Sequence, residues 1–359
     1  MNSPSHIIES DTLAGAKNPR FATELIGHSQ AWQTFLTSIE MKKMHHAWLI
    51  NGAKGIGKAT FAWKIAENLL NKNNNLNYHK KVRALSISNL FLCRRPYDEK
   101  AKRLKQVITI DEIRKLKSFF SLSATENDWR IAIIDSADEL NKSAANALLK
   151  ILEEPPQKSI FLIISHQPMT VPLTIRSRCR ILNLNKLTGK EIERVLRSSD
   201  YNIKNLSKND QHILAVISEG SVGTAMTALN QDGILIFKLC FEILLELPYF
   251  DRIKILKIAE LVKGNNEKFR FFSFILLLII SRIALLATPV NYIIGTEEEN
   301  LLIEKLSINV NTANKLAKLY IDLSHAFLSC YALNLDKSRQ IVTAFTDIEK
   351  TITGKNYER

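Results

Sequence analysis

The first half of the chain alternates short apolar runs with segments whose apolar residues recur at helical spacing. The apolar runs are four or five residues long, are rich in Ile, Leu and Val, and cover residues 47–51, 107–110, 131–134, 160–164 and 181–184. Such runs are typical of strands that are covered on both faces. Two of the helical segments begin with a good N-cap residue, Asp111 and Asn141. Alternating strands and helices predict a parallel sheet built from βαβ units.

The pattern changes at about residue 185. From there to residue 359 nearly all apolar residues recur at helical spacing, and no further strand is indicated. The pattern therefore predicts an α/β domain followed by helical domains. A length of 359 residues fits two or three domains at roughly 100 to 200 residues each.

Composition narrows the class of protein. With 46% hydrophobic and 24% charged residues, the chain can bury a core, which excludes intrinsic disorder. Its four cysteines lie too far apart for a CxxC metal motif or a dense disulfide framework, so we expect a reducing, cytoplasmic compartment. The first twenty residues lack the continuous apolar stretch of a secretory signal, and we interpret them as a loose N-terminal extension.

The most apolar stretch, residues 271–296, is expected to be a buried core helix. Only eleven uncharged residues run from Phe271 to Ser281, Arg282 follows near the middle of the stretch, and Pro289 comes later. A run this short is typical of a core helix, and a central arginine would cost about 2.5 kcal/mol or more on membrane insertion. We therefore expect no membrane span.

A glycine-rich segment follows the first predicted strand. It has the pattern GxxxxGK and opens a helical segment, with its key positions at Gly52, Gly55, Gly57 and Lys58. In that context backbone N–H groups bind phosphates and the lysine reaches the β and γ oxygens. The next residue is Ala59, where the full motif has a Ser or Thr whose hydroxyl holds Mg²⁺. Thr60 follows Ala59, but successive residues on a helix are rotated by about 100° from each other, so the Thr60 hydroxyl should not simply replace the missing one. Two interpretations stay open, a loop that binds ATP and a phosphate loop kept only as architecture.

The strand predicted at residues 131–134 ends in an acid, Asp135, as expected for the metal-organising residue of a phosphate-loop ATPase. Hydrolysing proteins of this kind usually have Glu next, which activates the attacking water, but here the residue is Ser136. Loss of a general base costs about 10² to 10⁴ in rate. We therefore expect no efficient ATP hydrolysis by this chain alone.

Three arginines, Arg176, Arg178 and Arg180, alternate along the segment between the last two predicted strands. Taken alone, they are typical of a solvated charged surface. After a phosphate-loop sheet they also fit an arginine finger, which stabilises phosphoryl-transfer charge in a neighbouring subunit.

Four segments together carry a resemblance to a known family: HHAWLINGAKGIGKATFA, WRIAIIDSADELNKSAANALLKILEEPP, FLIISHQP and TIRSRC. They resemble the bacterial clamp-loader family of AAA+ proteins, strongly over residues 21–184 and more weakly to 219–223. The resemblance implies an AAA+ phosphate-loop domain over 21–185, a small helical lid domain over 186–232 and an all-α C-terminal collar domain over 233–359, after an extension over 1–20.

The resemblance also implies roles for individual residues. Ser177, Arg178 and Cys179 match the SRC motif of the family, so Arg178 is expected to act as an arginine finger in trans. The expected nucleotide-binding residues, in a site that is either functional or vestigial, are Gly52, Gly55, Gly57, Lys58, Thr60 and Asp135. Ser165 falls at the family's first sensor position. Gly223 stands where the ATPase γ/τ subunits carry a sensor arginine, which favours a non-motor member.

The implied partners are the γ/τ ATPase subunits and the δ subunit, and indirectly the sliding clamp and primer-template DNA. No cofactor is required, although ATP binding stays open. Family members commonly carry a four-cysteine zinc module between the phosphate loop and the acidic strand. This interval contains only Cys93, so we expect no zinc and no other metal. A charged insertion of unknown role, residues 94–105, stands in its place.

Two other function classes are compatible with parts of the sequence. One is an ATP-hydrolysing γ/τ-like motor, which would have Ser or Thr at position 59 and Glu at position 136. The other is a basic DNA-binding module, since the chain has a formal net charge of +13. Residues 94–117 are strongly basic, but Tyr97 is their only aromatic residue, so a face that assists DNA binding is favoured over a single-strand binder. His45 and His46 are expected to be structural.

Overall fold

A computed structural model describes residues 9–10, 18–71, 76–121, 129–199, 201, 203, 205–286, 296–306 and 310–353. The chain forms two compact units. The first comprises residues 1–202 with 220–223, and the second comprises 203–219 with 224–359. Most of the predicted N-terminal extension, residues 1–20, lies outside the described residues. The boundaries predicted for the lid and collar domains stay predictions.

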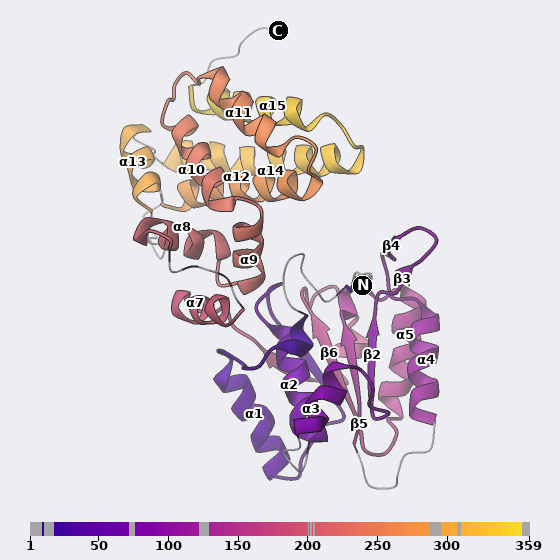
Figure 1. Cartoon of the computed structure of the whole chain (residues 1–359). Helices are drawn as coiled ribbons and strands as arrows, with labels where there is room; N and C mark the ends of the chain where they lie inside the picture. The colour runs from indigo at the N-terminus through magenta and orange to yellow at the C-terminus, as the bar shows by residue number, and fades with distance from the viewer. Residues whose placement is uncertain are drawn as a thin grey trace, which may run out of the picture. The chain divides into compact units, whose positions relative to one another are not determined.

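The first unit is built on a five-stranded sheet in the order β2-β5-β6-β1-β7, in which all neighbours are parallel (Figure 1). The strands are β1 (Ala47–Asn51), β2 (Leu90–Arg94), β5 (Arg130–Asp135), β6 (Ser159–Ser165) and β7 (Arg180–Asn183). The fold class predicted from the sequence, an α/β phosphate-loop domain followed by helices, is confirmed.

One predicted strand is wrong. In the segment 107–110, Ile108 forms only an isolated bridge to Leu140, and Ile110 already begins a helix. The fifth strand is instead β2, which pairs with β5 alone and therefore lies at the edge of the sheet. β2 contains four consecutive apolar residues, Leu90 to Cys93, which the predicted strands did not include, and as an edge strand it is only partly buried.

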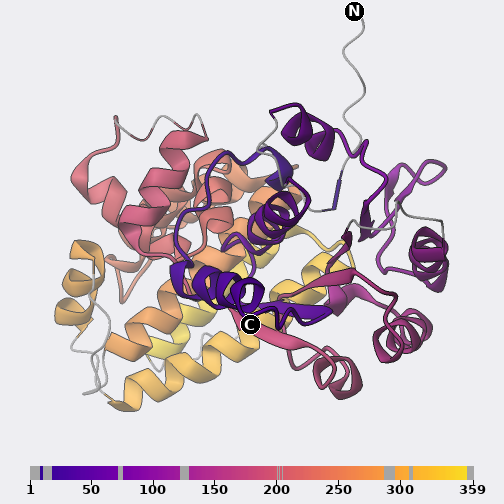
Figure 2. The ribbon, with the colours of Figure 1, turned by 90° about the horizontal axis from the view of Figure 1, so that it is seen from below.

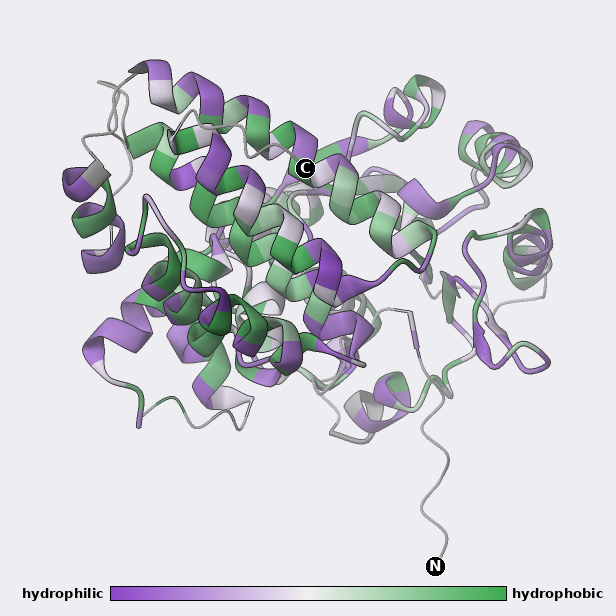
Figure 3. Ribbon diagram, turned by 90° about the horizontal axis from the view of Figure 1, so that it is seen from above, coloured by the Kyte–Doolittle hydropathy of each residue, from purple (hydrophilic) through white to green (hydrophobic). Residues whose placement is uncertain are grey.

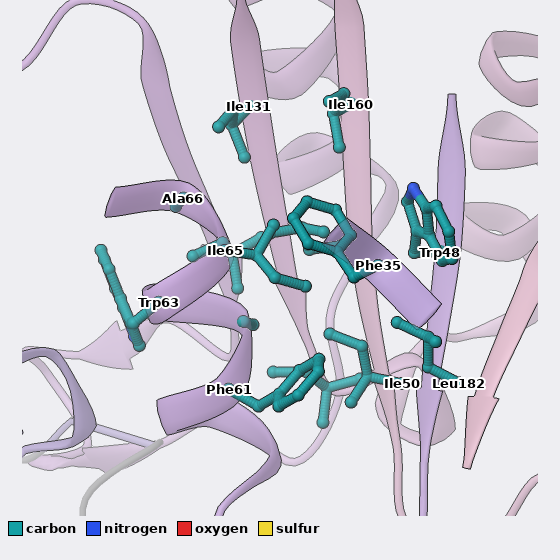
Figure 4. Packing of buried hydrophobic residues seen from close by; sticks show 14 of the residues in the cluster. Phe35, Trp48, Ile50, Phe61, Trp63, Ile65, Ala66, Ile131, Ile160 and Leu182 are labelled. Carbon is teal, nitrogen blue, oxygen red and sulfur yellow. The ribbon is translucent and has the colours of Figure 1, made fainter. Parts of the chain in front are cut away.

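Helices cover both faces of this sheet, because alternate strand residues point to opposite faces. On one face, α1 (Ser29–Glu40) and α2 (Lys58–Leu70) pack with Trp48, Ile50 and Leu162 in a core that Figure 4 shows from close by. On the other face, α4 (Ile110–Ser121) and α5 (Lys142–Glu153) pack against Leu49 and Ile163. Figure 2 shows the strands between these helix pairs.

Short elements complete the first unit. They are η1 (Pro19–Phe21), α3 (Leu76–Arg83), the two-stranded hairpin of β3 (Tyr97–Asp98) and β4 (Arg103–Leu104), η2 (Ala137–Glu139), α6 (Leu173–Arg176) and α7 (Gly189–Ser198). The N-cap predicted at Asn141 is confirmed, because its side chain accepts a hydrogen bond from the Ala144 N–H at 2.8 Å. The N-cap predicted at Asp111 is wrong, because α4 begins at Ile110 and Asp111 lies within its first turn.

The described residues of the second unit form helices and no strand, as predicted. The helices are α8 (Lys208–Ser218), α9 (Val222–Asn230), α10 (Gly233–Leu244), α11 (Arg252–Val262), α12 (Asn266–Leu286), α13 (Glu297–Leu306), α14 (Val310–Ala332) and α15 (Lys337–Thr353), of which α9 begins in the first unit. Apolar and polar residues are interspersed along most of these helices, as expected of helices that bury one side (Figure 3).

Helix α12 is a core helix of this unit. Among the described residues it is the one helix long and apolar enough to cross a membrane, but 56% of its apolar stretch is buried inside the protein. Near its end, Arg282 is buried and its Nη2 lies 2.8 Å from Oε2 of Glu299, which is also buried. A buried, ion-paired arginine satisfies its charge within the helical unit. The prediction of a core helix is therefore confirmed, while Pro289 lies outside the described residues.

Candidate nucleotide-binding site and the Arg178 segment

The glycine-rich loop lies where the sequence predicts it, between the carboxyl end of β1 and the start of α2. Two of its glycines have left-handed backbone angles, with φ of 79° at Gly55 and 101° at Gly57. Residues with a side chain rarely adopt these angles, so the loop needs glycine at both positions. Its backbone thus has the strand, loop and helix geometry of a phosphate loop.

Lys58 turns back onto its own loop. Its Nζ donates hydrogen bonds to the carbonyl oxygens of Gly52, at 2.7 Å, and Ala53, at 2.6 Å. The side chain is almost fully buried, and burial lowers its pKa to about 8, although the carboxylates of Asp135 and Asp138 act in the opposite direction. In this conformation the ammonium group is satisfied by loop carbonyls.

The residues after Lys58 bear on Mg²⁺ binding. Ala59 is partly buried and packs against the core on the α1 and α2 face of the sheet. No hydroxyl therefore follows Lys58 at the position that holds Mg²⁺ in the full motif. Thr60 is half-buried one residue further along α2.

Strand β5, which ends in the predicted acid, ends at the same side of the sheet as the loop, with β6 between β5 and β1. Asp135 ends β5, is buried, and acts on Lys58 through its charge. The next side chain, Ser136, is also buried, and its Oγ makes no hydrogen bond within the described residues. A serine cannot act as the general base that a glutamate would supply, so the structure places no carboxylate directly after Asp135.

Asp138 organises the turn after β6. Its Oδ1 accepts hydrogen bonds from Ser165 Oγ at 2.8 Å and Thr170 Oγ1 at 3.0 Å, and its Oδ2 accepts one from the His166 N–H at 2.6 Å. Burial would raise the pKa of Asp138, but these hydrogen bonds hold it below its usual value. Ser165, at the predicted sensor position, is therefore bonded to a carboxylate that the sequence did not single out.

Two histidines near the loop were also missed. His28, before α1, lies with its Nε2 2.8 Å from the carbonyl oxygen of Ile56 in the loop, and burial lowers its pKa. His166, directly after β6, is largely buried, and burial lowers its pKa to about 4, with a further contribution from the charge of Lys58. His28 lies outside the segments that carry the family resemblance, and His166 lies within FLIISHQP but had no role assigned to it, so only the fold shows that both lie near the loop.

A segment distant in sequence closes on the loop. Ser221 Oγ donates to the carbonyl oxygen of Lys54 at 3.0 Å, and the Gly223 N–H donates to the carbonyl oxygen of Gly55 at 2.9 Å. The contact is so close that a Cβ placed on Gly55 would lie 2.4 Å from Ser221 Oγ and 3.1 Å from the Cα of Gly223. Position 223, compared above with a sensor arginine, thus contacts the loop through its backbone.

The three arginines of the TIRSRCR segment take three different positions. Arg176 Nη1 donates to the carbonyl oxygen of Pro168 at 3.2 Å, and Arg180 lies over the ring of Trp48, with 5.0 Å between its Cζ and the ring centroid. Arg178 Nη1 donates to the carbonyl oxygen of Thr174 at 3.0 Å. Arg178 also pairs with Glu153 of α5, at 2.8 Å, and its side chain remains 36% exposed. Arg178 is therefore held in position and accessible.

The neighbours of Arg178 in the SRC motif are less accessible or locally bonded. Ser177 Oγ donates to the carbonyl oxygen of Thr174 at 3.1 Å. Cys179 packs against the core on the α4 and α5 face, and burial raises the pKa of its thiol to about 12. A thiol with so high a pKa is neutral at physiological pH, which suits a packing role better than metal binding.

Arg178 and the phosphate loop lie at opposite ends of the strands: Arg178 at the amino end of β7 (the amino edge of the sheet) and the loop at the carboxyl end of β1 (the carboxyl edge). In the parallel pair of β1 and β7, Trp48 lies beside Arg180 and Asn51 beside Asn183. Arg178 therefore precedes the amino edge, whereas Gly52 follows the carboxyl edge. Three residues of strand between these edges span about 10 Å, before the lengths of the two loops are added.

Within the part of the chain that the structure describes, no group of three or more His, Cys, Asp and Glu side chains is placed to hold a metal ion. Cys93 is buried within β2, and burial raises its pKa to about 12. His45 and His46 stack with 4.5 Å between their ring centroids. The absence of zinc stays a prediction.

Comparison with known proteins agrees with this geometry. Residues 27–188 match the family model described as DNA polymerase III, delta subunit. The chain is 29% identical to the DNA polymerase III subunit gamma of Buchnera aphidicola (subsp. Schizaphis graminum) over 61% of its own length and 59% of that protein. It is 33% identical to the subunit delta' of the same organism, over 47% of its length and 52% of that protein.

The chain thus spans between half and three fifths of these two relatives. Among solved structures, a DNA polymerase III gamma subunit-related protein from Thermotoga maritima is similar, with 19% identity, a TM-score of 0.47, and coverage of 90% of this chain and 100% of that one. The family match and the two relatives thus make residues 27–188 similar to the DNA polymerase III, delta subunit family and to clamp-loader subunits.

Proposed function

We propose that the chain is a delta-prime-like subunit of the DNA polymerase III clamp loader, which helps load the sliding clamp on primed DNA in the cytoplasm. In this proposal it does not hydrolyse ATP efficiently itself. It joins the γ/τ ATPase subunits and the δ subunit, and it supplies Arg178 in trans to the active site of a neighbouring ATPase.

One observation carries the trans role. Arg178 precedes the amino edge of the sheet, while its own phosphate loop follows the carboxyl edge. A finger must approach the γ-phosphate closely to stabilise the charge that develops there. Arg178 cannot do so for its own loop without unfolding the sheet between them, but its partly exposed guanidinium group can reach a nucleotide on another subunit.

The phosphate loop supports a non-motor role. Position 59 offers a methyl group where Mg²⁺ needs a hydroxyl, and position 136 offers a hydroxyl where hydrolysis needs a carboxylate. Lys58 is engaged by carbonyls of its own loop. These features oppose turnover more than binding, because the loop backbone could still hold phosphate if Lys58 turned outward. Retained ATP affinity would therefore be compatible with the proposal.

A γ/τ-like motor is the second candidate, and the extent of the similarity favours it. The match to the gamma subunit covers 61% of the chain, compared with 47% for the delta' subunit. Residues 59 and 136 favour the non-motor role, because a motor needs the two functional groups that they lack.

ATP turnover distinguishes the two candidates. The chain alone, at micromolar concentration with Mg²⁺, is expected to show no hydrolysis above background. Added to γ/τ ATPase subunits with δ, clamp and primed DNA, it is expected to raise their turnover. Robust hydrolysis by the chain alone would establish the motor instead, and failure to affect the ATPase subunits would reject a role in their complex.

A further inference from the structure

The charged insertion that replaces the zinc module forms a distinct surface feature. Residues 97–104 fold as the β3–β4 hairpin, in which Tyr97 pairs with Leu104 and Asp98 with Arg103 (Figure 1). The hairpin follows β2, so it leaves the sheet at the carboxyl edge, where the phosphate loop also lies. Neither the SRC motif nor the loop requires this element.

The base of the hairpin is anchored by two ion pairs. Arg95 Nε lies 2.7 Å from Oε2 of Glu139 in η2, and Arg94 Nη2 lies 2.9 Å from Oε1 of Glu9. The Lys105 N–H also donates to the carbonyl oxygen of Pro96 at 3.0 Å. These contacts occupy the two arginines at the base and fix the direction in which the rest of the hairpin projects.

The remaining basic side chains of the hairpin face solvent. Lys100, Lys102, Arg103 and Lys105 are all exposed, and none forms an ion pair with the described residues. Two acids, Asp98 and Glu99, belong to the same hairpin, so residues 97–105 carry four basic and two acidic side chains, a formal charge of +2. Asp98 Oδ1 accepts the N–H groups of Lys100 and Ala101, both at 3.0 Å, and its carboxylate also interacts with the charges of Lys105 and Arg103. The outer part of the hairpin is therefore net positive, and its cations are exposed.

We propose that the β3–β4 hairpin binds the phosphate backbone of duplex DNA through Lys100, Lys102, Arg103 and Lys105. Exposed cations on a short hairpin can contact phosphates of the backbone, and each such contact releases a counterion from the DNA. The proposal goes beyond the trans role of Arg178 and does not depend on it. It implies binding without sequence preference, since phosphate contacts carry no base information.

Two observations favour duplex DNA over other acidic partners. Between Asp98 and Lys105 the only apolar side chains are Ala101 and the half-buried Leu104, so the hairpin lacks the aromatic and apolar anchors of a protein interface, where lysine is depleted. Tyr97 is the only aromatic residue in the hairpin, and it is half-buried. Binding of single strands usually needs several stacking aromatics, so a duplex fits better.

Direct binding of the full-length chain to a labelled duplex of mixed sequence tests the proposal. The variant replaces Lys100, Lys102 and Lys105 by Gln. The matched control replaces three exposed lysines of the helical unit, Lys257, Lys315 and Lys318, by Gln, which changes the net charge equally. Fluorescence anisotropy at several salt concentrations gives the affinity and its salt dependence, and thermal unfolding verifies that both variants fold.

We expect the hairpin variant to bind about tenfold or more weakly at low salt, with a slope of log K against log salt smaller by about 2.7, as three lost phosphate contacts require. The control should bind like wild type. An equal loss of DNA affinity in both variants would show that the effect depends on net charge alone, and would overturn the proposal. Unchanged DNA binding, with lost binding to the γ/τ subunits, would identify an acidic protein as the partner and also overturn it.

These outcomes are independent of the proposed trans role. A hairpin variant that loses DNA binding should still let Arg178 act on partner subunits at saturating DNA. Failure of the DNA experiment therefore leaves the finger proposal standing, and failure of the finger leaves the DNA contact standing.

Discussion

The ammonium group of Lys58 lies 2.7 Å from the carbonyl oxygen of Gly52, in the loop that begins the same motif. The lysine expected to reach the phosphate oxygens thus also stabilises the loop that carries it. Because the side chain is buried, its charged form is disfavoured in the folded protein, and its pKa falls to about 8.

This shift predicts a pH dependence of stability. Between pH 8 and pH 10.5, Lys58 has lost its proton in the folded state but keeps it in the unfolded state, whose pKa is near 10.5. The unfolded state then binds more protons, so the free energy of unfolding rises with pH across this window. Relative to Lys58→Met, wild type should gain up to about 3 kcal/mol from pH 7.5 to 10.5.

Urea unfolding of both proteins at several pH values measures this difference, because all other titrations cancel between them. A constant difference between wild type and Lys58→Met over the whole range would contradict a lowered pKa for Lys58.

Asp138, to which the sequence assigned no role, is predicted to contribute strongly to stability. Asp138→Ala leaves the Ser165 hydroxyl and the His166 N–H without their acceptor, so we expect a loss of about 3 kcal/mol near pH 7. Because the pKa of Asp138 is lowered in the folded state, its stabilisation is present above about pH 4 and is lost as pH falls through the folded pKa.

The free energies of unfolding of wild type and Asp138→Ala should therefore converge in acid. Asp111→Ala serves as the control, since Asp111 is an exposed carboxylate that pairs with Arg114, and its substitution should cost less than about 1 kcal/mol. An Asp138→Ala protein as stable as this control at pH 7 would refute the role of Asp138.

Substitutions at two glycines, compared with each other, test the contact between the loop and residues 220–223. Gly55 and Gly264 have nearly equal φ angles, 79° and 77°, but a Cβ on Gly55 would meet Ser221, whereas one on Gly264 would meet nothing within 4 Å. Both substitutions to Ala should cost about 1 kcal/mol from backbone strain. Gly55→Ala should cost a further 1 to 3 kcal/mol, on the order of an overpacking penalty.

Thermal unfolding of the two variants gives this comparison directly. If Gly55→Ala and Gly264→Ala lower stability equally, the segment 220–223 does not press on the loop as described. If only Gly55→Ala is strongly destabilised, the close contact is real.

The buried pair of Arg282 and Glu299 gives a fourth prediction. Glu299→Ala removes the carboxylate that pairs with the buried Arg282, which should cost about 3 to 5 kcal/mol. Replacing both residues, Arg282→Met with Glu299→Leu, removes the charges together and should cost much less. Chemical denaturation of the three proteins measures the effects, and a double variant as unstable as Glu299→Ala would contradict a simple buried pair.

Much of the phosphate-loop unit could be predicted from the sequence, because its central strands are buried on both faces. Residues 131–134 and 160–164 are continuous apolar runs for that reason, and both are strands. Strand β2 was not predicted although Leu90 to Cys93 is also an apolar run, and as an edge strand it is only partly buried. The segment around Ile108 has the apolar residues of a strand because Ile108 is buried, but it forms only an isolated bridge.

The candidate site was predictable only where a motif marks it. The loop at Gly52 and the acid Asp135 carry local signatures, and both lie at the carboxyl edge of the sheet. The contacts that Ser221 and His28 make with the loop bridge long stretches of chain, and both end on backbone carbonyls, which leave no trace in the sequence. Only the fold reveals these contacts.

The central claim is that Arg178 acts on a neighbouring active site. The most direct measurement is the DNA- and clamp-stimulated ATP turnover of γ/τ subunits with δ, in the presence of wild type, Arg178→Ala or Arg114→Ala. Arg114 is an exposed arginine on α4 and serves as the matched control. Gel filtration establishes that each variant assembles.

We predict that wild type and Arg114→Ala stimulate turnover equally, whereas Arg178→Ala assembles but loses about 10³-fold or more of the stimulated rate at the site it serves. Equal stimulation by all three proteins would contradict the account and leave the chain as a scaffold without a finger.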